Sequence, residues 1–151
     1  KEVGADRIVN AIAAYKLYGG PVIIVDFGTA TTFCAVNKEG VYLGGAITPG
    51  IEISAEALFE KTAKLPKIEF IKAKHPIGSN TITAMQSGMF FGYLGLTNEL
   101  IRRFKRELGE DSVVVATGGQ AELMGNESKL IDKINPFLTL QGLHMIYEMN
   151  K

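Results

Sequence analysis

The amino-acid sequence predicts an α/β fold in which helices flank a mixed sheet that contains an antiparallel three-stranded hairpin unit. A continuous β-branched run at residues 22–25 is typical of a strand buried on both faces. Short strands separated by glycine turns follow it up to residue 47. A second apolar run, at residues 113–116, lies between two helical patterns. With 151 residues, the chain can bury a core without disulfides.

The composition excludes several classes of protein. An apolar content of 46%, with sixteen basic and sixteen acidic side chains, excludes intrinsic disorder and leaves no net field for nucleic acid or anionic lipid. The single cysteine, Cys34, excludes an internal disulfide and indicates a reducing compartment. No apolar stretch reaches the roughly 18 residues that cross a bilayer. We therefore expect a cytoplasmic protein that binds neither nucleic acid nor membrane.

The first predicted element is a helix that follows Asp6. Apolar residues recur at helical spacing from Ile8 to Leu17, and Gly19-Gly20-Pro21 ends the pattern. Asp6 stands where its carboxylate could cap the first turn.

Three antiparallel strands are expected next. The buried run at 22–25 leads into a glycine turn, and residues 31–36 return alongside it. Residues 41–47 form a third strand, which Gly44-Gly45 interrupts. Pro49-Gly50 ends this sheet unit.

Helices are expected in the middle of the chain. Ser54 caps a predicted helix that runs to about residue 64, and residues 65–80 form an irregular surface segment. Asn80 precedes a long helix at 81–108 as a plain N-cap. Three glycines weaken that helix and suggest that another group approaches its face closely: Gly88, Gly92 and Gly95.

The C-terminal third returns to the sheet. The buried strand at 113–116 is followed by a glycine turn and a helix around residues 121–124. Residues 137–140 are expected to form a short last strand, and residues 142–149 a closing helix.

The strongest local motif is Asp26-Phe27-Gly28-Thr29-Ala30-Thr31-Thr32. A buried strand ends here in a carboxylate, a glycine permits a tight turn, and hydroxyls line the returning strand. Backbone N–H groups and the Thr29 hydroxyl can donate to phosphate oxygens, and Asp26 can hold a cation. The alternative is a hairpin whose Asp and Thr satisfy only the donors of the turn.

Two further motifs can take part in the same chemistry. Thr117-Gly118-Gly119 follows the other buried strand and would let a nucleotide pass close to the backbone, although such turns also occur without a ligand. In Gly4-Ala5-Asp6-Arg7, a carboxylate that can accept a hydroxyl proton stands beside a guanidinium that can hold an anion. On local grounds alone, Gly4-Ala5-Asp6-Arg7 is more typical of a helix N-cap followed by an exposed arginine.

In this order, the motifs resemble those of the type III pantothenate kinases. The resemblance spans nearly the whole chain and rests on these segments: Gly4-Ala5-Asp6-Arg7, Asp26 to Thr32, Gly44-Gly45-x-Ile47-x-Pro49-Gly50, Thr62-Ala63-x-Leu65-Pro66, Asn80-Thr81, Gln86-Ser87-Gly88 and Ala116-Thr117-Gly118-Gly119. It implies the actin-like, RNase H-like kinase fold, a homodimer, and transfer of the ATP γ-phosphate to pantothenate at the opening of coenzyme A synthesis.

The resemblance also implies roles for single residues. Asp6 resembles the general base, and Gly4, Ala5 and Arg7 resemble the pantothenate-binding turn around it. Asp26 resembles the ligand of a monovalent cation, K⁺ or NH₄⁺, and Thr29 resembles a contact to ATP, whose phosphates Mg²⁺ would bridge. Thr81 resembles a substrate contact that reaches a pantothenate bound mainly by the partner subunit.

The chain departs from the family pattern in two places. The family opens with an Asp-x-Gly-Asn-Thr loop that grips phosphate, and nothing here matches it. We therefore expect residues 1–151 to be the second, C-terminal domain of such a kinase, with the substrate motif and a linking helix in residues 1–20, and to be inactive without an upstream first domain. Cys34 replaces a frequent acid, with consequences expected for packing only.

Two other functions stay open at this stage. One is a non-catalytic nucleotide-binding accessory module of the same fold, against which the presence of both Asp6 and Asp26 argues. The other is an actin-like kinase for a sugar or acetate, which the Gly4–Arg7 turn disfavours.

Overall fold

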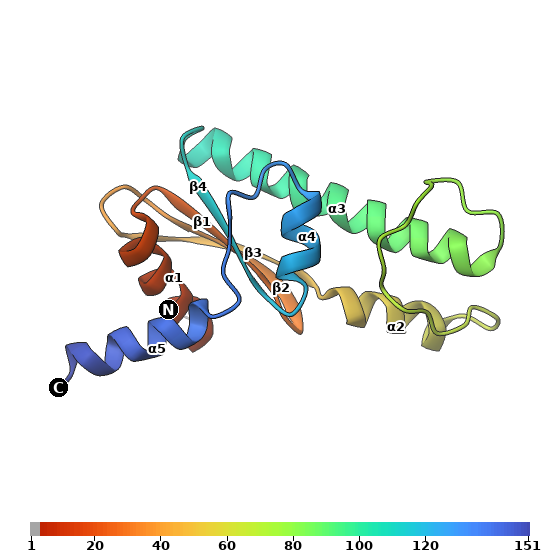
Figure 1. Cartoon of the computed structure of the whole chain (residues 1–151), viewed down its shortest axis with the longest axis horizontal. Coiled ribbons are helices and arrows are strands. Elements are labelled where there is room, and N and C mark those ends of the chain that lie inside the picture. Colours follow the sequence, from red (N-terminus) through yellow and green to blue (C-terminus); the bar gives the residue numbers. More distant parts are fainter. Residues whose placement is uncertain (1–3) are drawn as a thin grey trace.

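The computed structural model describes residues 4–151, which form a mixed five-stranded sheet with helices on both faces (Figure 1). Its elements, in chain order, are α1 (Ala5–Tyr18), β1 (Val22–Phe27), β2 (Ala30–Val36), β3 (Tyr42–Pro49), α2 (Ile51–Lys61), α3 (Thr81–Leu108), β4 (Val113–Gly118), α4 (Ala121–Glu127), β5 (Lys133–Ile134) and α5 (Leu138–Met149). Within this described part, no helix has the length and apolar character needed to cross a membrane.

The strand order is β3-β2-β1-β4-β5, which places β1 at the centre of the sheet. The strands β1, β2 and β3 pair antiparallel, as the glycine turns predicted. In contrast, β1 and β4 pair parallel, as do β4 and β5. The carboxyl ends of β1 and β4 therefore lie at the same edge of the sheet.

The apolar core has two layers because β1 is buried on both faces. Ile23, Val25 and Phe27 pack with residues of α2, α3 and α4 on one face. Val22 and Ile24 alternate with them and pack against α1 and α5 on the other face. This alternation explains why the strand is a continuous run of apolar residues in the sequence.

The long helix begins at the residue that the sequence predicted. Asn80 caps α3, because its side-chain Oδ1 accepts a hydrogen bond of 2.9 Å from the Thr83 backbone N–H. The Thr83 side chain bonds back to the Asn80 N–H, which completes a capping box. Residues 65–80 contain no helix or strand, in agreement with the predicted surface segment.

Two predicted helix caps and one predicted strand are wrong. The helix α2 begins at Ile51 with Gly50 as its N-cap, so Ser54 lies inside the helix and does not cap it. Asp6 lies in the first turn of α1, but Gly4 is the N-cap and no side chain caps this helix. Residues 137–140 are not a strand: the Asn135 side chain accepts a 3.0 Å bond from the Phe137 N–H, and the turn starts α5.

The glycines of β3 and α3 also differ from the prediction. The strand β3 continues through Gly44 and Gly45, but its pairing is irregular beside Gly44: Ala35 pairs with Gly44 and Val36 with Tyr42, so Leu43 of β3 has no partner on β2. A Cβ added to any of three exposed glycines of α3 would meet no described atom within 4 Å: Gly88, Gly92 and Gly95. The expected close approach is therefore not made by residues 4–151.

Candidate functional site

The site forms where β1 and β4 end side by side, each followed by a glycine turn. Asp26 is paired with Thr117, and Phe27 with Gly118. Gly118 has a φ of 96°, and a Cβ there would lie 2.6 Å from the Phe27 carbonyl oxygen and 2.7 Å from Asp26 Oδ1. Only glycine lets β4 turn this close to the Asp26 carboxylate.

The Asp26 carboxylate is half-buried and is held from the side of α1. Its Oδ2 accepts a 3.1 Å hydrogen bond from the Asn10 side-chain amide. Burial raises the pKa of Asp26, the hydrogen bond from Asn10 lowers it, and the negative charge of Asp6 raises it again. A bound cation would offset both the burial and the neighbouring charge, so the donor chemistry here fits a cation.

Asp6 and Asn10 are brought to this place by helical periodicity. They are four residues apart on α1 and therefore lie on the same face, one turn from each other. Asp6 is exposed, whereas Asn10 is buried. The exposed carboxylate of Asp6 is thus close enough to influence the pKa of Asp26 while it remains accessible to a ligand.

Arg7 and Gly4 lie together at the start of α1. The Nε and Nη2 atoms of Arg7 are 3.8 Å from the position of a Cβ on Gly4. The positive charge of Arg7 also lowers the pKa of two neighbouring groups, Tyr42 and Cys34, although burial dominates both and raises the pKa of Tyr42 to about 12. The guanidinium is therefore on the side of α1 that faces β2 and β3, and Ala5 is exposed beside it.

A cavity of about 320 Å³ adjoins the glycine turns. Its lining comes from three loops and helix starts: Phe27, Gly28, Thr29, Ile51, Glu52, Ile53, Gly119 and Gln120. Thr29 is exposed there, and the first turn of α2 contributes N–H groups that have no partner within the helix. A turn of this kind attracts anions, because the free N–H groups and the helix dipole both present positive charge.

The position of α2 depends on Gly50. A Cβ on this residue would overlap the carbonyl oxygen of Thr29 and lie 2.8 Å from that of Gly28. The absence of a side chain lets the start of α2 pack directly against the Gly28-Thr29 turn. From the sequence, Pro49-Gly50 indicated only the end of a sheet, so the contribution of α2 to the cavity was missed.

The turn between β1 and β2 is tied to α3 by Tyr93. Its buried hydroxyl lies 2.6 Å from Thr31 Oγ1, 2.6 Å from the Pro49 carbonyl oxygen and 3.1 Å from Thr48 Oγ1. One side chain therefore joins the start of β2 and the end of β3, the two strand ends that flank the cavity. Tyr93 was expected only as part of the apolar face of the helix.

Thr81 is not brought to this site within one chain. It is the first residue of α3 and is exposed. The start of α3 lies at one end of the long axis of the molecule, whereas α1 lies towards the other end (Figure 1).

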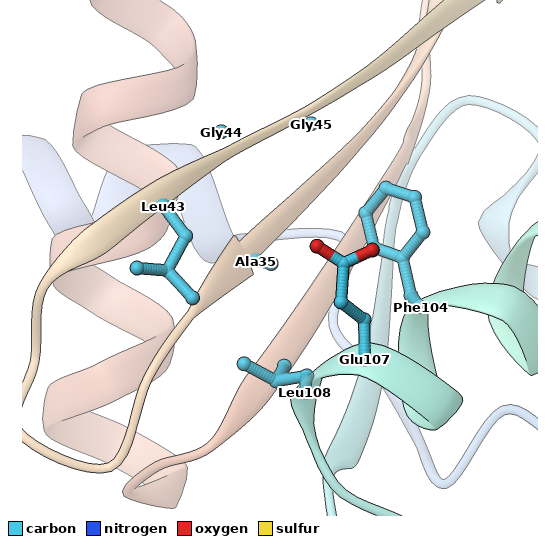
Figure 2. A pocket seen from close by; sticks show the side chains of 7 residues that line it. All are labelled: Ala35, Leu43, Gly44, Gly45, Phe104, Glu107 and Leu108. Carbon is cyan, nitrogen blue, oxygen red and sulfur yellow. The ribbon is translucent and has the colours of Figure 1, made fainter.

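A second hollow, of about 250 Å³, lies between β3 and the last turns of α3. Figure 2 shows Glu107 and Leu108 extending from α3 towards the strand that carries Leu43, with Gly44 and Gly45 beside it. It contains none of the predicted site residues. Among residues 4–151, no three or more His, Cys, Asp or Glu side chains gather in a way that could hold a metal ion.

Comparison with known proteins decides the family. Residues 1–103 match the family model of the type III pantothenate kinases. This chain belongs to that family. The matched region includes the Gly4–Arg7 motif, Asp26, Thr29 and Thr81, whereas the Gly118-Gly119 turn lies beyond it.

Solved structures agree on the fold. A Campylobacter jejuni structure described as a Baf family transcriptional activator has a TM-score of 0.63 and 21% identity over 99% of this chain and 66% of that chain. This chain thus spans slightly less than two thirds of the length of the Campylobacter jejuni protein. A ParM filament subunit from Clostridium botulinum has a TM-score of 0.44 and 15% identity, over 96% of this chain and 52% of that one, and we base no argument on it. The mixed sheet flanked by helices confirms the α/β architecture that the sequence predicted.

Proposed function

We propose that this chain forms part of an enzyme that phosphorylates pantothenate with ATP to give 4′-phosphopantothenate, the first step of coenzyme A biosynthesis. The proposal rests on one observation above all. In a chain of this family, Asp6 lies close enough to Asp26 to raise its pKa, and both are near two glycine turns and a cavity that the start of α2 helps to line. A base, a cation ligand and an anion-binding cavity are the groups that phosphoryl transfer needs.

Asp6 is assigned the role of general base. Its exposed carboxylate would accept the proton of the pantothenate primary hydroxyl while that oxygen forms a bond to the γ-phosphorus. The bond between the γ-phosphorus and the bridging oxygen breaks, and ADP leaves. Arg7, with Gly4 and Ala5 beside it, would hold the pantothenate carboxylate.

The nucleotide is assigned to the cavity next to Asp26. The Thr29 hydroxyl and the free N–H groups of the first turn of α2 would bind phosphate oxygens, and the Gly118-Gly119 turn would lie on the nucleoside side. Asp26 would hold a monovalent cation, K⁺ or NH₄⁺. Mg²⁺ supplies charge neutralisation on the phosphates when it is bound.

The position of Thr81 leads us to propose a homodimer. Since the start of α3 lies far from α1 in one chain, Thr81 would contact pantothenate in the site of a second copy. We further propose that residues 1–151 are the second domain of the enzyme, with the substrate motif and linking helix in residues 1–20. Residues 1–3 of that motif region lie outside the described part.

The test replaces Asp6 in the enzyme that contains this chain. Asp6→Asn removes the proton acceptor at constant size, so kcat should fall at least about 100-fold while ATP still binds. Asp111→Asn, the same change at an exposed position between α3 and β4, should leave kcat unaltered. Turnover is measured as pantothenate-dependent ADP release, and ATP affinity by titration calorimetry.

Two results would contradict the proposal. Turnover of Asp6→Asn at the level of the unaltered enzyme would remove Asp6 from the role of base. Tight ATP binding by the unaltered protein without turnover on pantothenate would indicate the non-catalytic nucleotide-binding module, and turnover on a sugar or acetate would indicate a different substrate.

A further inference from the structure

A chain of two hydrogen bonds links the C-terminal helix to the proposed cation ligand. The Thr139 hydroxyl of α5 donates to Asn10 Oδ1 at 2.7 Å, and Asn10 Nδ2 donates to Asp26 Oδ2 at 3.1 Å. Asn10 is only 2% exposed. These three residues come from α5, α1 and β1, which are far apart in the sequence.

The two bonds together fix the orientation of the Asn10 amide. The ionised Asp26 carboxylate can only accept, so the Asn10 Nδ2 donor lies towards Asp26, and Asn10 Oδ1 accepts from the Thr139 hydroxyl on the α5 side. An inverted amide would place two acceptors, Asn10 Oδ1 and Asp26 Oδ2, against each other. Asp26 therefore determines which Asn10 atom faces it, and Thr139 anchors the opposite end of the amide.

The second bond leaves the two oxygens of Asp26 in different surroundings. Oδ2 is bound to Asn10, whereas Oδ1 lies 2.7 Å from the position of a Cβ on Gly118 and 3.5 Å from that of a Cβ on Gly28. The oxygen that Asn10 does not occupy thus faces the two glycine turns that border the cavity.

The helix α5 is packed closely enough to hold Thr139 in place. A Cβ on Gly142, one turn after Thr139, would lie 2.5 Å from the Val9 carbonyl oxygen, next to Asn10 in the chain. Leu138, the neighbour of Thr139, is fully buried in the core layer of α1. The close contact between α5 and α1 therefore surrounds the Thr139–Asn10 bond.

We propose that Asn10 is a positioning residue: held by Thr139, it binds Asp26 Oδ2 and thereby presents Oδ1 to a monovalent cation at the glycine turns. The inference rests on the cation role of Asp26 in the proposed function. It gives α5 a part in the site although no residue of α5 lines the cavity.

The experiment measures the K⁺ response of the enzyme in two ways. One is the K⁺ concentration for half-maximal activity, and the other is the rise of Tm that K⁺ causes relative to choline at the same ionic strength. Asn10→Ala should raise the half-saturating K⁺ concentration about 10-fold or more, the usual effect of removing a group that orients a metal ligand. The KM for pantothenate should change little, and the K⁺-dependent rise of Tm should decrease.

Thr139 provides a milder variant in case Asn10→Ala does not fold. Thr139→Val keeps the shape but removes the hydroxyl that anchors Asn10 Oδ1, so Asn10 holds Asp26 less firmly and the half-saturating K⁺ concentration should rise about 3-fold or more. Thr139→Ser keeps the hydroxyl and should restore the original K⁺ response. Asn98→Ala is the matched control: its Oδ1 accepts a 2.6 Å bond from the Ser128 hydroxyl away from the site, so it should lower Tm without changing the K⁺ response.

Each outcome decides the inference separately from the proposed function. An unaltered K⁺ response in both Asn10→Ala and Thr139→Val overturns it and leaves pantothenate phosphorylation standing. The same result follows if the unaltered protein shows no K⁺ response in either measurement. If the protein does not phosphorylate pantothenate but its K⁺-dependent Tm rise is lost in Asn10→Ala, the inference holds and the proposed function fails.

Discussion

The cavity at the end of β1 and the hollow beside β3 look alike in composition but differ in the helix end that borders them. Each contains glycine and one glutamate, Glu52 in the cavity at the end of β1 and Glu107 in the hollow beside β3. The first is bordered by the start of α2, where N–H groups are free, and the second by the end of α3, where carbonyl groups are free. The helix dipole therefore favours an anion at the first and disfavours one at the second.

The groups behind the two hollows differ as well. The Asp26 carboxylate and the buried Asn10 amide form a polar network next to the first. The second is backed by apolar side chains, Leu43, Phe104 and Leu108 (Figure 2). A cavity with glycines is thus not by itself a ligand site; the direction of the helix dipole and the convergence of polar groups distinguish the two.

Gly118→Ala should have the largest effect and is compared with Gly44→Ala. Both glycines have a positive φ, 96° and 132°, so alanine is strained at both. At Gly118 the added Cβ also meets Asp26 Oδ1 and the Phe27 carbonyl oxygen, whereas at Gly44 it meets nothing within 4 Å. We expect Gly118→Ala to lower the free energy of unfolding by about 3 kcal/mol and Gly44→Ala by about 1 kcal/mol.

Urea unfolding and steady-state kinetics check this pair. Gly118→Ala should also weaken K⁺ activation, since the Cβ displaces the oxygen that we assign to the cation. Gly44→Ala should retain the activity of the unaltered enzyme. Equal losses of stability and activity in the two variants would show that backbone strain, and not contact with Asp26, makes Gly118 necessary.

The first hollow was only partly predictable from the sequence. Glycine turns after apolar runs identified Asp26 and Gly118, because a buried strand and a tight turn both leave local signals. The parallel register that puts these turns side by side is a long-range property, since all of α2 and α3 lies between the two strands. Asn10 was missed because a single asparagine in a helix has no distinctive local pattern, and its partners are tertiary.

The same reasoning explains the errors near the C-terminus. The strand β5 pairs over only two residues, Lys133 and Ile134, which is too short for any alternation of apolar and polar residues. The start of α5 is set by the Asn135 side chain, but the apolar residues after Phe137 suggested a strand instead. In both places a few specific hydrogen bonds decide the structure, and periodicity does not record them.

Tyr93→Phe should have an intermediate effect, because it removes the hydrogen bonds by which α3 holds the strand ends beside the first hollow. The buried hydroxyl joins Thr31 and Pro49, and its loss leaves these groups without that partner. We expect the free energy of unfolding to decrease by about 1–2 kcal/mol. The KM for ATP should rise, since the turn that carries Thr29 loses a support.

The control for Tyr93→Phe is Tyr147→Phe, because the Tyr147 side chain on α5 is 64% exposed. This change should alter the free energy of unfolding by less than about 0.5 kcal/mol. Thermal and urea unfolding measure both variants. If Tyr93→Phe were as stable as Tyr147→Phe, the hydroxyl would contribute nothing to holding the hairpin against α3.

Glu107→Gln should have the smallest effect and separates the two hollows most directly. Glu107 lies in the last turn of α3, where a negative charge is unfavourable, so its removal should stabilise the fold by about 0.3–0.5 kcal/mol. The KM for ATP and kcat should stay within about 2-fold, as for a surface change away from a site. Glu52→Gln, the same substitution in the first turn of α2, should change the KM for ATP because its carboxylate lines the proposed nucleotide cavity. Steady-state kinetics on both variants decide the assignment. A larger change in the KM for ATP from Glu107→Gln than from Glu52→Gln would place the nucleotide in the hollow beside β3 and contradict the proposed site.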